Sequence, residues 1–130
     1  MGDIKDLYEI TGDMLKKIKK FREDKSISRE ALGFVECYGV HWKITLKRNG
    51  EDFDVEVSLP RCPYCRTELQ EVHEGSGYDQ FFLGYDCPNP ECGRIKELNL
   101  NFNIEDCQER IRKTEYRKIE QKLEEEPIKN

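Results

Sequence analysis

Two close pairs of cysteines constrain this chain more than any other feature of its sequence. Cys62 and Cys65 flank one short turn, and Cys87 and Cys92 flank a second. Each turn places two thiolates side by side, and segment 66–86 between the pairs is long enough for an out-and-back pair of strands. Four facing sulfurs form a tetrahedral site for one Zn²⁺ ion. Since sulfur fills every position, we expect a structural metal with no coordination position for water or substrate.

The chain contains 6 cysteines, so a disulfide framework is the alternative to zinc. Disulfides occur mainly in secreted proteins, whereas the first ten residues carry four charged side chains and form no apolar signal sequence. We therefore favour zinc and expect a cytoplasmic location. Cys37 and Cys107 lie far from the pairs and are interpreted as small buried side chains. No segment approaches the ~20 apolar residues of a membrane span, which predicts a soluble protein without a membrane partner.

The expected fold class is α+β, in one compact unit. Its parts are a helical arm over 1–34, a β-hairpin over 35–60, a zinc ribbon over 61–104 and a C-terminal helix over 105–130. A charged fraction of 38% and a mean hydropathy of −0.86 indicate a small core. Zinc binding would add an apparent ~10 kcal/mol or more to the folding of such a chain.

Apolar residues recur at helical spacing from Ile4 to Phe21 and predict an amphipathic helix over 3–24. Thr11-Gly12-Asp13 resembles a helix cap, so a helix pair with a break at Gly12 remains open. A short helical turn is expected near 28–32. The C-terminal helix is expected from Asn103, with Asp106 in a capping-box variant, to about Glu125. Either long helix could pair with a second copy of the chain to form a homodimer.

Strict alternation on both sides of Asn49-Gly50 predicts a β-hairpin with a two-residue turn. That turn places Leu46 opposite Phe53, Ile44 opposite Val55, Trp42 opposite Val57 and Val40 opposite Leu59. On the other face it pairs Lys47 with Asp52 and Lys43 with Glu56. His41 falls on this polar face and is interpreted as a surface histidine. Further strands are expected at 68–74 and 78–86, joined by a tip at 75–77, with a third at 96–102.

The cysteine segment resembles known zinc ribbons. The motifs Cys62-Pro63-Tyr64-Cys65, Phe82-Leu83-Gly84 and Pro90-Glu91-Cys92 resemble the ribbons repeated at the C-terminus of bacterial topoisomerase I. The spacing of Cys87 and Cys92 is similar to that of the Ogr/Delta-type phage activators. Both resemblances cover about residues 60–102. They imply that Cys62, Cys65, Cys87 and Cys92 bind zinc, and that the protein contacts nucleic acid or RNA polymerase.

Charge separates two functional interpretations. Residues 61–104 hold four basic and seven acidic side chains, a net charge of −3, which is unfavourable for general DNA binding. We therefore expect a non-enzymatic interaction or regulatory protein that binds a macromolecular partner, a component of nucleic-acid machinery. The alternative is a protein that binds DNA or RNA directly. Its candidate contacts are Lys16, Lys17, Lys19, Lys20, Tyr78, Phe81, Tyr85, Arg94 and Lys96.

Each of these candidates also has a structural interpretation. The lysines can be the solvated face of a helix, and the aromatic side chains, with Phe82, can be a small ribbon core. His73 is a weak candidate for a metal ligand because four sulfurs already complete the shell. An enzyme using Asp52, Asp54 and Glu56 is the least favoured hypothesis, since no catalytic set accompanies these carboxylates.

Overall fold

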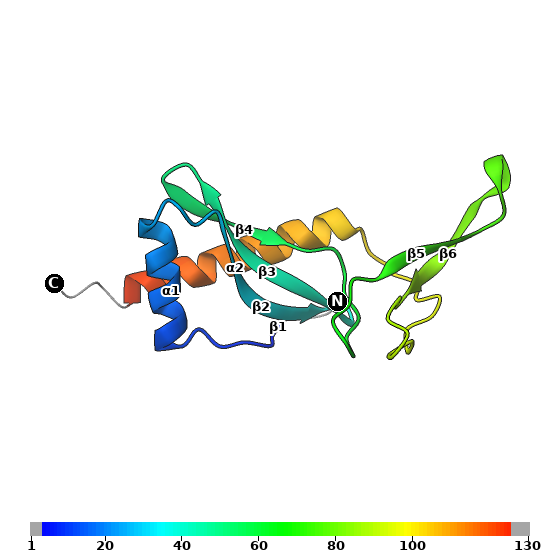
Figure 1. Ribbon diagram of the computed structural model, residues 1–130, viewed down its shortest axis with the longest axis horizontal. Coiled ribbons are helices and arrows are strands. Elements are labelled where there is room, and N and C mark those ends of the chain that lie inside the picture. Colours follow the sequence, from blue (N-terminus) through cyan, green and yellow to red (C-terminus); the bar gives the residue numbers. More distant parts are fainter. Residues whose placement is uncertain (1–3, 126–130) are drawn as a thin grey trace.

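The computed structural model describes residues 4–125, which form a four-stranded antiparallel sheet, a separate two-stranded hairpin and two α-helices (Figure 1). In chain order the elements are β1 (Lys5–Asp6), α1 (Gly12–Glu23), β2 (Arg29–Cys37), β3 (Val40–Asn49), β4 (Asp52–Val57), β5 (Gln70–Glu74), the 3₁₀ turn η1 (Gly77–Asp79), β6 (Phe81–Asp86) and α2 (Ile104–Glu125). The sheet order is β1-β2-β3-β4. The mixture of helices and antiparallel strands agrees with the expected class.

The N-terminal segment is the first correction, because no helix forms between residues 4 and 11. Lys5 and Asp6 form a short edge strand that pairs with Glu36 and Val35 of β2, and the helix starts only at Gly12. Thr11 is the N-cap, and its hydroxyl accepts a hydrogen bond from the backbone N–H of Met14 at 3.1 Å. The helix cap predicted from Thr11-Gly12-Asp13 is therefore confirmed. The apolar spacing before it was misleading, since pairing with β2 overrides helical propensity there.

Strand β2 replaces the helical turn expected near residues 28–32. It pairs antiparallel with β3, and the register shifts between Ala31 and Gly33. Leu32 is the extra residue of this bulge, so the buried positions change from even to odd numbers along the strand, from Leu32 to Val35 and Cys37. The bulge breaks the period-two pattern that would have identified the strand in the sequence.

The hairpin of β3 and β4 forms as expected, but its register differs by two residues. Leu46 lies opposite Val55 and Ile44 opposite Val57, because the turn is Gly50-Glu51 and not Asn49-Gly50. Gly50 has a φ of 61°, which glycine adopts without steric cost at the first central position of a hairpin turn. A shift of two residues keeps each side chain on its predicted face.

The new register does change individual partners. Lys47 lies opposite Asp54, and Thr45 lies opposite Glu56, so the predicted Lys47–Asp52 and Lys43–Glu56 pairs are wrong. Trp42 pairs with Val35 and Val40 with Cys37, both on β2. β4 ends at Val57, and Leu59 beyond it is exposed.

The core lies between the sheet and α2, which packs along β4 (Figure 1). Its buried side chains include Phe21 of α1, Trp42 and Ile44 of β3, and Ile111 and Ile119 of α2. Trp42 also donates its indole N–H to the carbonyl of Cys37 at 3.1 Å. The buried stripe of α2 therefore packs against the chain's own sheet. Asn103 caps this helix by accepting a hydrogen bond from the N–H of Asp106 at 3.0 Å, as the sequence predicted.

Strands β5 and β6 extend away from the sheet at the end of the molecule opposite α1 (Figure 1). Both expected strands form and end where predicted, at Glu74 and Asp86, but β5 begins two residues later than expected and β6 begins at Phe81, because η1 lengthens the tip. The expected third strand at 96–102 is reduced to a single bridge, in which Tyr85 and Leu98 exchange two backbone hydrogen bonds of 3.0 and 2.9 Å. Phe102 at the end of this segment stacks on Tyr38, which fastens the segment to the body.

Candidate metal centre

The first cysteine pair lies in a tight turn that follows β4. The N–H of Cys62 donates to the carbonyl of Thr67 at 2.8 Å, and the N–H of Arg66 donates to the carbonyl of Cys62 at 2.8 Å. Arg66 closes this turn with a φ of 64°, an uncommon conformation for a residue with a side chain. The N–H of Tyr64 lies 3.4 Å from Cys62 Sγ. Such N–H groups stabilise a thiolate.

The second pair lies in a turn that follows β6. The N–H groups of Cys92 and Gly93 both donate to the carbonyl of Asn89, at 3.1 and 3.0 Å. The side chain of Asn89 accepts a further hydrogen bond from Glu91 N–H at 3.0 Å, which fixes the turn. The N–H of Cys87 donates to the carbonyl of Ile95 at 2.9 Å. Local hydrogen bonds thus orient the cysteines of both turns.

The two turns bring all four sulfurs together. The Sγ atoms of Cys62, Cys65, Cys87 and Cys92 lie within 4.8 Å of one another, with Cys62–Cys92 at 3.8 Å and Cys65–Cys87 at 3.4 Å. A Zn–S bond of ~2.3 Å gives a tetrahedron with sulfurs about 3.8 Å apart. The donor set therefore fits a metal ion, and a tetrahedral set of four sulfurs is typical of zinc or iron.

The environments of the thiols differ. The Thr67 hydroxyl, 3.2 Å from Cys65 Sγ, lowers the pKa of that thiol to about 6. Burial raises the pKa of Cys87 to about 12. Four sulfurs at these distances cannot all be ionised without a cation between them, because like charges in one site repel. A divalent cation would supply the charge that allows all four to act as thiolates.

The cysteine cluster is joined directly to the sheet. Arg61 and His41 exchange backbone hydrogen bonds of 2.7 and 3.0 Å. The backbone of Arg61 also forms an isolated antiparallel β-bridge with Glu68. His41 at this junction is 8% exposed, so its interpretation as a surface histidine is wrong. Burial, and then the charge of Arg66, lower its pKa. His73 is exposed on β5 and contacts Glu71 at 3.2 Å, and it is not part of the cysteine cluster.

The candidate partner-contact residues fall at two ends of the molecule. Lys16, Lys17 and Lys20 are exposed on α1, and Lys19 is partly buried there. Tyr78 and Phe81 lie on the hairpin of β5 and β6 at the opposite end (Figure 1). Arg94 and Lys96 are exposed near the second cysteine turn, where the Arg94 guanidinium lies 5.2 Å from the Tyr64 ring centroid. The fold therefore does not bring the lysines and the aromatic side chains together.

The hairpin aromatics do not form the small core that the sequence also allowed. Tyr78 is 107% exposed, Phe81 56% and Phe82 45%. Tyr85 is partly buried, and Phe82 contacts its ring edge-on with centroids 5.2 Å apart. Cys37 and Cys107, by contrast, are buried as predicted, and burial raises the pKa of Cys107.

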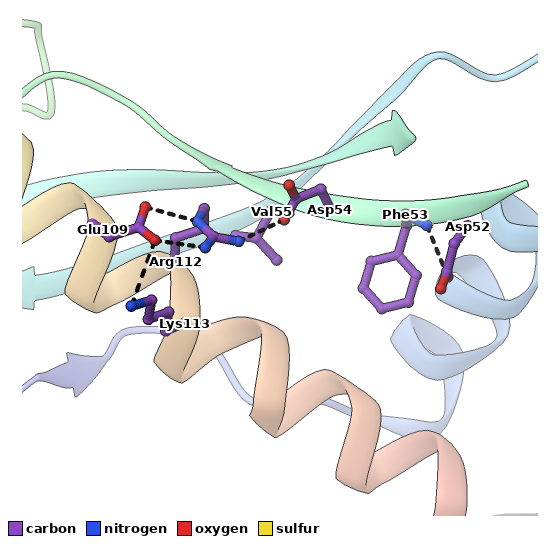
Figure 2. A network of polar contacts seen from close by, with 7 residues as sticks. All are labelled: Asp52, Phe53, Asp54, Val55, Glu109, Arg112 and Lys113. Atoms are coloured by element: carbon purple, nitrogen blue, oxygen red, sulfur yellow. Dashed lines mark hydrogen bonds and ion pairs between the residues drawn. The ribbon is translucent and has the colours of Figure 1, made fainter. Parts of the chain in front are cut away.

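The carboxylates of β4 are bound by arginines and not by the lysines that the sequence suggested. Arg112 donates to Asp54 at 2.9 Å and also contacts Glu109, which lies near Lys113 (Figure 2). Asp52 accepts the N–H of Phe53 at 2.8 Å and lies 3.8 Å from Arg22. Glu56 pairs with Arg29 at 3.1 Å.

The sequence did not predict the contacts of two further polar side chains, Glu115 and Arg48. Glu115 of α2 is fully buried and accepts a hydrogen bond from the Tyr8 hydroxyl, while Arg48 donates to carbonyls at the end of α1. Glu115 lies within the apolar stripe of its helix, between Ile111 and Ile119. That position was the one sequence signal of its burial.

No protein-family model, curated protein or solved structure matches this chain. Within residues 4–125, neither helix has the length and apolar composition needed to cross a bilayer.

Proposed function

We propose that Cys62, Cys65, Cys87 and Cys92 bind one structural Zn²⁺ ion and that residues 61–104 act as the zinc ribbon of a non-enzymatic interaction or regulatory protein. The convergence of four sulfurs within 4.8 Å carries this proposal. A shell of four thiolates leaves no position for a water or a substrate, which favours a structural metal over a catalytic one.

The pairing of the β4 carboxylates supports a role other than catalysis. An enzymatic alternative would use Asp54 and Glu56, but these groups form ion pairs with Arg112 and Arg29. A carboxylate whose oxygens are bound by a guanidinium is a less available metal ligand. Their arrangement is explained by the packing of α2 against β4 and by the reach of Arg29 from β2 across β3.

The partner in this proposal is a macromolecule of the nucleic-acid machinery, as the ribbon resemblance implies. Direct nucleic-acid binding is the alternative, and the exposed rings of Tyr78 and Phe81 favour it because bases stack on such rings. Its weakness is the distance to the α1 lysines at the other end of the molecule (Figure 1). A single nucleic-acid strand would have to follow the whole long axis of the molecule to reach both the hairpin rings and the α1 lysines.

Metal analysis of the purified chain tests the first half of the proposal. We expect one zinc per chain by elemental analysis, and loss of zinc together with ribbon structure in Cys87→Ser. Cys107→Ala is the matched control, because it removes a buried cysteine outside the cluster and should retain the metal. Iron in place of zinc, or a metal-free protein with the same fold, would contradict the assignment.

Binding assays test the second half. We expect no tight complex with labelled single-stranded or duplex DNA at low salt, and a specific protein partner that the wild type retains and Cys87→Ser does not. Tight DNA binding with a steep salt dependence would instead establish the alternative, since phosphate contacts release counterions.

A further inference from the structure

The hairpin that projects beyond the cysteine cluster concentrates the net charge of the protein. Residues 68–86, here called the acidic hairpin, contain Glu68, Glu71, Glu74, Asp79 and Asp86 and no lysine or arginine. Their formal charge of −5 equals that of the whole chain, so the rest of the chain is balanced. This concentration does not follow from the fold, because two short strands need no particular charge to pair.

Within the described chain, the exposed carboxylates of the acidic hairpin also have no lysine or arginine partners. Glu68, Glu71, Glu74 and Asp79 are exposed, and within residues 4–125 none of them forms an ion pair with lysine or arginine. Among the described residues the carboxylate of Glu71 pairs with His73, at 3.2 Å, and with no lysine or arginine. The carboxylates of β4, in contrast, each have an arginine partner. Asp86 has a structural role, since it accepts the N–H of Glu97 at 2.7 Å.

Aromatic side chains lie among these carboxylates. Tyr78 and Phe81 are at least half exposed and belong to the tip and to the start of β6. Phe82 is held between His73 and Tyr85 by ring contacts of 5.6 and 5.2 Å, so its orientation is fixed before any partner binds. Exposed rings on a projecting element typically mark an interaction site and are costly to keep in water.

We propose that the acidic hairpin docks onto an arginine-rich surface of a partner protein. Guanidinium groups pair bidentately with carboxylates and stack on aromatic rings, so one side-chain type satisfies both features of the hairpin. Phosphate groups of a nucleic acid would be repelled by the same carboxylates. The inference rests on the proposed function, for which it names the chemistry of the partner and the contacting residues.

A titration with a fluorescent peptide of alternating arginine and glycine tests this inference on the full, zinc-loaded chain. Backbone NMR shifts should concentrate at residues 71–82, and a matched lysine–glycine peptide should bind more weakly because ammonium groups do not stack in the same way. The double variant Tyr78→Ser/Phe81→Ser, which changes only exposed side chains, should weaken arginine-peptide binding about tenfold.

Charge variants separate docking from general attraction. Glu71→Gln/Glu74→Gln/Asp79→Asn should reduce binding and its salt dependence, whereas Glu9→Gln/Glu23→Gln/Glu120→Gln changes the net charge equally outside the hairpin and should leave binding intact. Equal effects of both triple variants, or no effect of the aromatic variant, would overturn the inference. Tighter binding of single-stranded DNA at the same residues would also overturn it.

Zinc content is measured on each sample, so failure of the metal assignment is distinguished from failure of the docking inference. Suppose that the zinc-loaded wild type and the aromatic and charge variants all bind the identified partner equally well. That result would be consistent with the proposed function but would refute the acidic hairpin as the docking surface.

Discussion

Removal of the Tyr8 hydroxyl tests how the N-terminal segment is fastened to α2. The hydroxyl donates a hydrogen bond to Glu115, whose carboxylate is fully buried. Lys118 lies 3.5 Å from the same carboxylate and 4.9 Å from the Tyr8 ring centroid. Tyr8→Phe keeps the ring, its packing on Gly33 and the contact with Lys118, so the substitution deletes one hydrogen bond.

The expected cost follows from the burial of the acceptor. A hydrogen bond to a charged group contributes about 1.5–3 kcal/mol, and a buried acceptor left without its donor retains the full desolvation cost. Glu115 Oε2 is already without a hydrogen-bond partner among the described residues, so only the Lys118 ammonium near Oε1 remains to compensate. We therefore expect Tyr8→Phe to lower the free energy of unfolding by about 2 kcal/mol at neutral pH.

The same carboxylate gives the protein a pH-dependent stability. Burial is the main cause that raises the pKa of Glu115 above its ordinary value of 4.5, so the folded state binds this proton more tightly than the unfolded state. The stability that this proton contributes is fully present when the pH is below the ordinary pKa of 4.5, and it is lost as the pH rises through the raised pKa of the folded state. Glu115→Gln should remove this dependence and cost little at neutral pH, because the amide can still accept the Tyr8 hydroxyl.

Urea unfolding followed by the fluorescence of Trp42 measures these changes, since that side chain is fully buried in the core. The difference between wild type and Glu115→Gln at each pH cancels the pH dependence of metal binding, which both proteins share. A loss below about 0.5 kcal/mol for Tyr8→Phe would refute the reasoning, because the bond would then contribute almost nothing. An equal loss in the Glu115→Gln background would refute the part of the cost that we assign to the charge of the acceptor.

Three further substitutions test other parts of the structure. Arg48→Lys should cost about 2 kcal/mol in urea unfolding, because one ammonium cannot replace a guanidinium that reaches the carbonyls of Phe21 in α1, of its C-cap Asp24 and of Ile27 beyond it; an unchanged midpoint would argue against this cap. Gly84→Ala places a Cβ 2.7 Å from the Glu97 carbonyl carbon, so zinc should be lost faster to a chelator than in Gly12→Ala, whose Cβ meets nothing within 4 Å. Asp54→Asn should cost at most about 1 kcal/mol, since the ion pair with Arg112 is partly exposed, and should leave the zinc content unchanged.

Features set by a few neighbouring residues were predictable from the sequence. The two cysteine turns, the Thr11 and Asn103 caps and the alternation of β3 each depend on residues within about one turn or one strand. Their physical signals are local, so tertiary contacts did not override them. The meeting of the four sulfurs was predictable because a hairpin returns the chain to its starting point.

Features set by distant parts of the chain were not predictable in the same way. Glycine at position 50 permits either of two adjacent hairpin turns, and both keep the apolar face intact, so the pattern of side chains could not choose the register. The bulge at Leu32 concealed β2 because it changes the phase of alternation. Residues 4–11 look helical in isolation, but Lys5, Asp6 and Leu7 bond to the open edge of β2 and the segment forms no helix.

The ion pairs show why charge alone could not identify the docking surface. The sequence assigned lysine partners from the neighbouring strand to the carboxylates of β4, but arginines from α1, β2 and α2 bind them. A carboxylate within the body of the fold can therefore find a cation far away in sequence. The acidic hairpin projects beyond the reach of those elements (Figure 1), so its carboxylates have no such choice within the described chain. Cations that pair with these groups would therefore come from the solvent or from a partner, and this is the premise of the proposed docking surface.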